Sequence, residues 1–161
     1  MRVIDREQID ALLAGATTAP RRRVHFNLHA DPAEPINRLV IALEPDAYIR
    51  PHRHTDRFEL FVLIAGRCAL LTFDGDGGVT RRVEMGDGGP RIAEFPPGVW
   101  HSLVALEAGT VVLEVKPGPY VPTAGPDFAA WAPPEGDDRA AACREWMRQA
   151  CVASGMARLG Q

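Results

Sequence analysis

The chain has 161 residues, 46% hydrophobic and 24% charged, so it can bury one core of ordinary size and fits one globular domain with terminal extensions. Its formal net charge of −3 argues against a general nucleic-acid binder. No apolar run approaches the roughly 20 residues that cross a bilayer, and residues 1–17 lack the apolar core of a secretory signal. We therefore expect a cytoplasmic protein that binds neither nucleic acid nor membrane.

The first segment, residues 4–16, predicts a short helix. Asp5 can cap its start, and Gln8 follows three residues later as in a capping box. Ile9, Leu12 and Leu13 form one apolar stripe, as expected of a helix that packs on a larger body. Residues 1–20 are therefore interpreted as an N-terminal helical extension outside a barrel.

The next segment, residues 24–29, alternates between apolar and polar side chains in the manner of a β-strand. His25, Asn27 and His29 share one face. A polar face of this kind either meets water or lines a pocket. His25 and His29 are accordingly candidate substrate contacts.

From residue 37 onward, short strand-like segments follow one another at regular intervals. Turn formers separate them, including Gly66 and the Pro96-Pro97-Gly98 sequence. This spacing predicts an all-β, double-sheet jelly roll over residues 21–118. The expected strands span residues 37–43, 47–52, 58–64, 67–73, 79–84, 91–95, 100–106 and 110–116.

Four residues in this region have the chemistry and the spacing of a metal site. His52 and His54 fall on one face of any strand because the period of a strand is two, and Glu59 follows five residues later. His101 follows the Pro-Pro-Gly turn after two intervening residues, at the head of an apolar segment. Imidazole nitrogens together with a carboxylate oxygen suit a divalent transition metal.

The order of these residues resembles the two sequence motifs of the cupin superfamily. His52, His54, Glu59 and Gly66 look like the first motif, and Pro96, Gly98 and His101 look like the second. Two positions depart from the usual pattern: Asp46 stands where the first motif opens with glycine, and Ala105 where the second ends in asparagine. Neither departure removes a ligand, so the resemblance implies a metal-binding cupin fold, a double-stranded β-helix.

Within the cupins, the segments FDGDGGV, PPGVWHSLVALE, EVKPGPY and FAAWAPPEGD resemble the WbuC family, over a match that runs from about Arg21 to Asp138. That resemblance implies a single-domain metalloprotein, often met near genes for bacterial surface polysaccharide, without a settled reaction. The alternative is a degenerate cupin that keeps the barrel and has lost the metal.

The predicted site holds one divalent ion, either Zn, Fe, Mn or Ni, and the residues do not distinguish among these metals. Three imidazole nitrogens and one carboxylate would leave one or two positions open for water or substrate.

Several other polar residues are candidates for the substrate pocket. Arg50 shares the parity of the two ligand histidines and is expected to face the interior, whereas Arg53 is expected to point outward as an ion-pair partner. Arg57 lies in the turn before Glu59 and could hang over the entrance.

Glu114 and Lys116 share one face of the last strand. A charged pair inside a barrel needs compensation, so an outward ion pair is the favoured interpretation. Because Lys116 and Tyr120 lie in the segment most like the WbuC family, both are also candidate substrate contacts.

Residues 119–161 are predicted to form an ordered arm followed by a helix, both packed on the barrel. Phe128 and Trp131 are expected to pin the arm by burying apolar area. Asp137 or Asp138 is expected to cap a helix that runs to about residue 154 and stops at Gly155. Its apolar stripe is Cys143, Trp146, Met147, Ala150 and Cys151.

These features favour a metal-dependent enzyme that acts on a small sugar-related or other polar molecule. Such an enzyme could be an isomerase, an epimerase or an oxygenase. The family resemblance points toward sugars or sugar nucleotides of bacterial polysaccharide metabolism. Two alternatives remain open: an Fe(II)-dependent dioxygenase, and a non-catalytic sensor that binds metal and ligand. Since cupins commonly pair through sheet edges, a homodimer is also expected.

Overall fold

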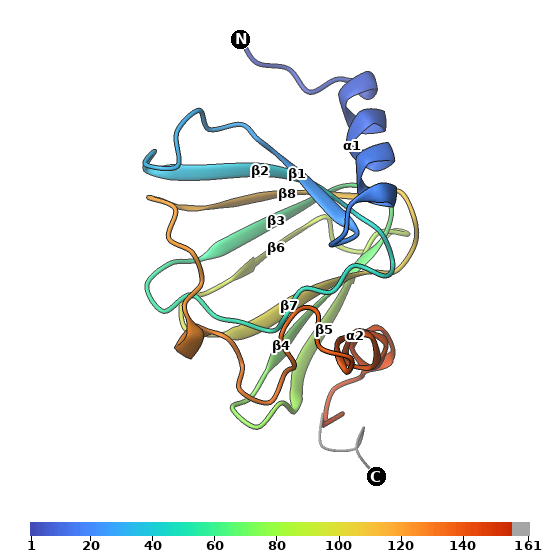
Figure 1. Cartoon of the computed structure of the whole chain (residues 1–161), viewed down its shortest axis with the longest axis vertical. Coiled ribbons are helices and arrows are strands. Elements are labelled where there is room, and N and C mark those ends of the chain that lie inside the picture. The colour runs from blue at the N-terminus through green and yellow to red at the C-terminus, as the bar shows by residue number, and fades with distance from the viewer. Residues whose placement is uncertain (156–161) are drawn as a thin grey trace.

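A computed structural model describes residues 1–155 of the chain. Its eight strands form two antiparallel sheets that face each other, as predicted for a jelly roll (Figure 1). The larger sheet has the order β1 (Arg23–Asn27), β2 (Ile36–Leu43), β8 (Thr110–Pro117), β3 (Glu59–Ala65) and β6 (Ile92–Phe95). The smaller sheet has the order β5 (Val79–Met85), β4 (Cys68–Phe73) and β7 (Trp100–Ala105).

The main core lies between the two sheets. Because side chains alternate along a strand, residues on one face of β2 to β8 enter this core. The larger sheet supplies Leu43, Phe61 and Val112, and the smaller sheet supplies Leu70 and Leu103, all nearly inaccessible to solvent. The metal-ligand candidates lie at one end of the same interior.

Each sheet also buries its outer face under a helix. Helix α1 (Arg6–Thr18) packs Ala16 against Val40 and Val111 on the larger sheet, and helix α2 (Ala140–Gln149) packs Cys143 and Met147 on the smaller sheet (Figure 1). This arrangement explains why several strands are apolar on both faces. In the described residues no helix combines the length and the apolar character needed to span a membrane.

The start of α1 follows the sequence prediction. Asp5 accepts a hydrogen bond from the Gln8 backbone N–H at 3.0 Å, and the Gln8 side chain accepts one from the Asp5 N–H at 3.3 Å. The capping box is therefore confirmed.

Gly66, in the hairpin between β3 and β4, is required by both conformation and space. Its φ is +72°, and a Cβ there would lie 2.6 Å from the Thr110 Cα.

The predicted strand over residues 47–52 is wrong, because only His52 makes a β-bridge there. Pro51 has no N–H to donate. Other backbone groups of this segment make isolated hydrogen bonds. The Ile49 carbonyl accepts from the Ser102 hydroxyl at 2.7 Å, and the Pro51 carbonyl accepts from the Ala129 N–H at 2.9 Å. The segment is thus held between β7 and the C-terminal arm without forming a ladder.

The predicted limits of the C-terminal helix are also wrong. Arg139 occupies the N-cap position without a side-chain bond, because the Asp137 carboxylate instead accepts from the Arg139 N–H in the preceding turn. The helix ends at Gln149, and the following residues hydrogen-bond to the Val79 backbone, which leaves Cys151 exposed. The last six residues of the predicted C-terminal region, 156–161, lie outside the described residues.

The arm between β8 and α2 contains a short 3-10 helix, Gly125–Asp127, and packs as predicted by its aromatic residues. Trp131 lies against Phe73, with ring centroids 5.0 Å apart, and Phe128 lies against His52 at 6.3 Å. The arm therefore reaches from the smaller sheet to the metal-ligand candidates.

Replacing Met147, a fully buried residue of α2, with alanine tests this packing. We expect Met147→Ala to lower the free energy of unfolding by about 2–5 kcal/mol, because the side chain leaves a cavity between helix and sheet. The matched control, Glu145→Ala in the same helix, should change it by less than about 0.5 kcal/mol. Equal effects of the two variants in urea unfolding would show that α2 does not pack as described.

Candidate metal centre

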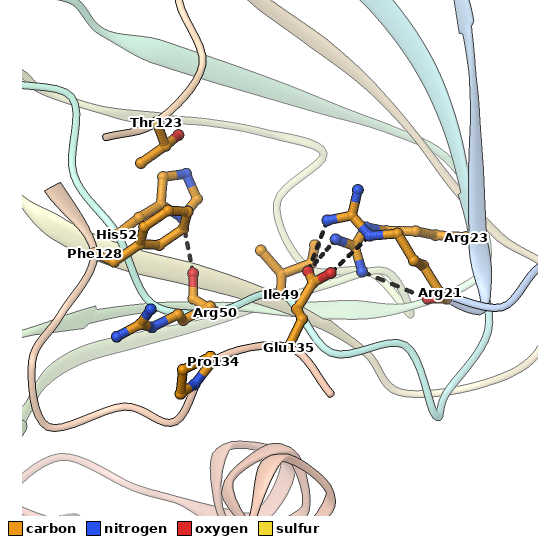
Figure 2. A pocket seen from close by; sticks show the side chains of 9 residues that line it. All are labelled: Arg21, Arg23, Ile49, Arg50, His52, Thr123, Phe128, Pro134 and Glu135. Carbon is orange, nitrogen blue, oxygen red and sulfur yellow. Dashed lines mark hydrogen bonds and ion pairs between the residues drawn. The ribbon is translucent and has the colours of Figure 1, made fainter. Parts of the chain in front are cut away.

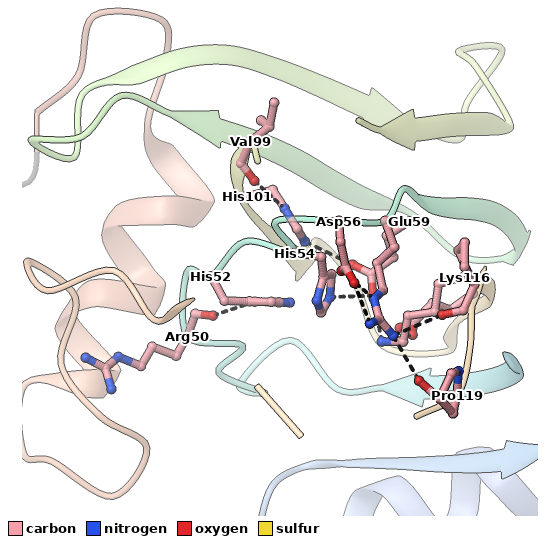
Figure 3. Close-up of polar contacts among 12 residues, drawn as sticks. Arg50, His52, His54, Asp56, Glu59, Val99, His101, Lys116 and Pro119 are labelled. Carbon is pink, nitrogen blue, oxygen red and sulfur yellow. Dashed lines mark hydrogen bonds and ion pairs between the residues drawn. The ribbon is translucent and has the colours of Figure 1, made fainter. Parts of the chain in front are cut away.

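Two regions that are distant in sequence bring the four predicted ligands together. His52 and His54 precede β3, Glu59 begins β3, and His101 lies in β7. One nitrogen or oxygen of each side chain lies within 4.8 Å of those of the other three (Figure 3). The sequence prediction that these residues converge is thus realised in the structure.

Backbone hydrogen bonds fix the ligand-bearing segment. His52 and His101 exchange two of them, at 3.0 and 2.8 Å, which places their side chains next to each other. The N–H of Gly98 donates to the His54 carbonyl at 2.7 Å, and Gly98 has a φ of +79°. The glycine of the Pro-Pro-Gly turn therefore positions the second histidine as well as the fourth ligand.

Hydrogen bonds on the outer ring nitrogens orient two imidazoles toward the cluster. His52 Nδ1 lies 3.0 Å from the Arg50 carbonyl, and His101 Nδ1 lies 2.8 Å from the Val99 carbonyl (Figure 3). A carbonyl only accepts, so each Nδ1 carries the proton and each Nε2 presents a lone pair. This is the arrangement in which a histidine ligates a metal ion through Nε2.

The remaining contacts also fit a bound cation. His54 Nε2 is buried and has no hydrogen-bond partner among residues 1–155. Glu59, 2% exposed, places one carboxylate oxygen 2.9 Å from His101 Nε2 and the other 3.4 Å from His54 Nε2. Atoms that share one ion at about 2.0–2.2 Å lie about 3–4 Å apart. The four residues therefore suit a divalent metal ion.

The protonation states match this interpretation. Burial alone would raise the pKa of Glu59, but the adjoining His101 and His54 rings and the charge of Lys116 hold it well below its usual value. Burial, together with the neighbouring His101, lowers the pKa of His52 to about 3. Near neutral pH the cluster thus has an ionised carboxylate and an unprotonated His52.

Lys116 and Glu114 do not form the outward ion pair that was expected. Lys116 pairs with Asn37 across β8 and β2, and Glu114 pairs with Phe61 across β8 and β3, so both point into the barrel. Lys116 Nζ lies 2.8 Å from Glu59 and 2.7 Å from Glu114. Ionised Glu59 compensates the charge of Lys116.

Burial of Glu114 and the nearby charge of Glu59 raise its pKa to about 8, although Lys116 opposes the shift. Burial would lower the pKa of Lys116. The negative charges and hydrogen bonds of Glu114 and Glu59 have a larger effect and raise that pKa. The sequence analysis did not include Glu114 among the site residues. Glu114 lies two residues before Lys116 and on the same face of the strand, so the choice of Lys116 as a candidate could have included it.

The cluster borders a small interior cavity of about 90 Å³. Its walls are mostly apolar and include Phe61, Phe95 and Val112, while Ser102, Glu114 and Lys116 supply polar groups. The cavity can hold about three waters, each occupying about 30 Å³, or the end of a small molecule.

The two predicted arginines have other roles. Arg50 does not face the interior: its guanidinium donates to the Ala132 and Ala129 carbonyls at 3.0 and 3.1 Å, and only its backbone carbonyl faces His52 (Figure 3). Arg57 pairs with Asp56 and donates to the Pro117 and Pro119 carbonyls at 3.2 and 2.9 Å. Arg53 points outward as predicted, with its guanidinium 4.4 Å from the centre of the Trp100 ring.

The three remaining candidate substrate contacts, His25, His29 and Tyr120, lie apart from the four-residue cluster. His25 is exposed on β1, and desolvation followed by the charges of Arg21 and Arg23 lowers its pKa. His29 is buried, and its Nδ1 accepts from the Arg38 N–H at 3.0 Å. Tyr120 is 53% exposed. None of these three lines the cavity beside the cluster, so their role as substrate contacts remains a prediction.

A second cavity, of about 360 Å³, adjoins His52 and was not predicted. Arg21 and Arg23 of the β1 segment and Glu135 of the C-terminal arm line it (Figure 2). Arg21 and Arg23 share the parity of His25 and Asn27, so the alternation that predicted a polar face on this strand could have included them.

Sequence comparison places the chain in a family. The model of a family described as "Domain of unknown function (DUF6016)" matches residues 4–85, just over half of the chain. The chain belongs to this family. The matched range includes three members of the cluster, His52, His54 and Glu59, and ends before His101. A comparison with curated protein sequences finds no match.

Solved structures of oxalate decarboxylase show the same fold. A deletion mutant of Bacillus subtilis oxalate decarboxylase is 25% identical with a TM-score of 0.51, over 68% of this chain and 28% of that one. A second oxalate decarboxylase structure, from a study of its reaction specificity switch, is 24% identical with a TM-score of 0.50 and the same coverage. KdgF from Halomonas sp. is 19% identical with a TM-score of 0.47, over 65% of this chain and 85% of that one.

The chain thus spans just over a quarter of each oxalate decarboxylase chain that it matches. These proteins are cupins, and the predicted cupin jelly roll is confirmed for this member of the DUF6016 family.

The pKa of His52 predicts how acid affects the metal-free protein. The imidazole has a pKa of about 3 in the folded protein, against about 6.5 in an unfolded chain. Between these values the unfolded chain binds the additional proton, so stability is lost as pH falls from about 6.5 toward 3. Metal-free wild type should lose up to about 1.4 kcal/mol per pH unit more than His52→Gln in this window. Parallel unfolding free energies from pH 7 to 4 would contradict this assignment.

The cluster also predicts the effect of removing one ligand. His54→Ala should lose stoichiometric metal binding while its circular dichroism remains that of an all-β protein, because the apolar core does not include His54. Arg53→Ala, which changes the outward-pointing neighbour, should retain the metal. A full metal equivalent in His54→Ala, measured by elemental analysis, would exclude this cluster as the site.

Proposed function

We propose that the protein is a metal-dependent enzyme that acts on a small polar molecule. The observation that carries this proposal is that the three histidines and Glu59 border an interior cavity which also contains Lys116 and Glu114. Metal sites with a purely structural role are closed by four protein ligands, whereas catalytic sites keep a position open to substrate. The cavity provides that open side.

Within the cavity, each charged side chain has a distinct role. Lys116 donates to one oxygen of Glu59 at 2.8 Å, which orients the other oxygen toward His101. Glu114, with its raised pKa, holds a proton near neutral pH and can exchange it with a substrate atom in the cavity. Lys116 can stabilise negative charge that develops on the substrate.

A divalent ion held by His52, His54, Glu59 and His101 would polarise a carbonyl or hydroxyl oxygen of the substrate, or lower the pKa of a bound water. Zn, Fe, Mn and Ni are all compatible with three imidazoles and one carboxylate.

Together these roles favour proton transfer next to a carbonyl, the chemistry of an isomerase or an epimerase. The resemblance to the WbuC family supports the finer proposal that the substrate is sugar-related and belongs to bacterial polysaccharide metabolism. This finer proposal rests on family analogy.

The test begins with untagged protein purified without added metal, whose metal content is measured first. The metalloprotein is then incubated in D2O with nucleotide sugars, sugar acids and simple diketones, and proton NMR follows the exchange of C–H groups beside carbonyls. We expect exchange with a sugar-related compound, and loss of exchange in Lys116→Met, which should retain the metal.

Two results would contradict the proposal. Oxygen consumption with a diketone, without exchange of any sugar, would identify an Fe(II)-dependent dioxygenase. Ligand binding by the metalloprotein without any turnover would indicate a non-catalytic sensor.

A further inference from the structure

The cavity of about 360 Å³ beside His52 has the size of a small-molecule pocket, since such pockets occupy about 300–1,000 Å³. We call it the arginine chamber; Arg21, Arg23, Arg50, Glu135 and His52 are among its lining residues (Figure 2). Ile49 and His52 also line the inner cavity, so the two spaces meet at a predicted metal ligand.

The C-terminal arm lines this chamber and is attached on both sides of it. On one side, the Ala129 N–H donates to the Pro51 carbonyl at 2.9 Å and the Arg53 N–H donates to the Asp127 carbonyl at 3.0 Å. On the other side, Glu135 accepts from Arg21 at 2.6 and 2.8 Å and also pairs with Arg23.

The charge of the lining is unbalanced. Three arginines and one glutamate line the chamber, which leaves an excess of positive charge beside His52. The guanidinium of Arg50 donates hydrogen bonds to two backbone carbonyls of the arm, those of Ala129 and Ala132. Arg21 and Arg23 both pair with the Glu135 carboxylate. Two guanidinium groups converging on one carboxylate form a strong, geometrically specific anion site.

We propose that the arginine chamber binds an anionic group of the substrate, a carboxylate or a phosphate, and that Glu135 occupies this position when no ligand is bound. The identification of that ligand as the substrate rests on the proposed function; anion binding by the chamber does not.

The geometry supports exchange between Glu135 and a ligand. The side chain of Arg21 is 64% exposed and that of Glu135 is 33% exposed, so both are accessible to an entering anion. Arg23, 15% exposed, is anchored by its hydrogen bond to the Tyr48 carbonyl at 2.7 Å and stays in place. An entering anion would accept the N–H donors that Glu135 releases, so no buried guanidinium is left unpaired.

The positions of the two cavities also define the shape of the ligand. Figure 2 shows His52 and Phe128 on one side of the chamber and the Arg21–Arg23–Glu135 group on the other. The inner cavity, about 90 Å³, has room only for the reacting end. A molecule that reaches both therefore has a small reactive group separated from its anionic group by several bonds, as in a sugar acid or a sugar phosphate.

Calorimetric titration with inorganic phosphate and with malonate, at constant ionic strength, tests this proposal. Malonamide, the neutral counterpart of malonate, is the control ligand. Titrations of metal-loaded and chelator-treated protein separate binding in the chamber from direct coordination to the metal.

Glu135→Gln should raise the affinity for the bound anion about tenfold, because it removes the competing carboxylate while keeping the side-chain shape. Arg21→Gln should lower the affinity by a similar factor. Arg139→Gln, which alters an exposed arginine paired with Asp137 outside the chamber, should change neither. A gain of affinity in Glu135→Gln cannot arise from damage to the fold.

Phosphate binding alone would identify a phosphorylated ligand, and malonate binding alone a carboxylate ligand; either supports the chamber. No binding of either anion by folded protein, or a loss of affinity in Glu135→Gln, would overturn it. Anion binding by chelator-treated protein is expected if the chamber acts alone. The proposed function would instead be refuted if the purified protein holds no metal and takes none up when metal is added, a result that leaves anion binding by the chamber in place.

Discussion

The structure of the metal centre depends on the backbone pairing of residues 51–54, a segment that belongs to neither sheet. His52 exchanges two hydrogen bonds with His101 in β7, and the Gly98 N–H fixes the His54 carbonyl. On its other side, Pro51 and Arg53 bond to the C-terminal arm. Without these bonds, two of the four predicted ligands would lie on an unattached loop, and the metal centre would lack the preorganisation that a defined coordination geometry requires.

This pairing links elements that serve different purposes. The two sheets provide the apolar interior, α1 and α2 cover their outer faces, and the arm connects the α2 side of the molecule to the ligand-bearing segment. The arm therefore contributes to the fold through Trp131 and to the site through Phe128 and Glu135.

The second constraint is electrostatic. Isolated charges buried in such an interior would each cost several kcal/mol, so charged groups there must occur in compensated sets. Glu59, Glu114 and Lys116 form one such set, and Arg21, Arg23 and Glu135 form another. The two sets lie at the two cavities that share His52 as a lining residue.

Local patterns in the sequence were sufficient for much of this description. The capping residues Asp5 and Gln8, the turn residues Gly66 and Gly98, and the spacing of the four metal-ligand candidates all act over short distances or follow the strand period. Contacts between distant segments were not accessible in this way. Arg50 faces away from the interior because the carbonyls of Ala129 and Ala132 attract it, and Glu114 turns inward beside Lys116, which compensates it.

X-ray absorption spectroscopy at the edge of the bound metal tests the central claim most directly. The account predicts nitrogen and oxygen scatterers at about 2.0–2.2 Å, with the outer-shell features of three imidazole rings, no sulfur, and at least one exchangeable light ligand. Sulfur scatterers at about 2.3 Å would place the metal at a cysteine instead, and a spectrum without imidazole features would contradict the His52–His54–Glu59–His101 site.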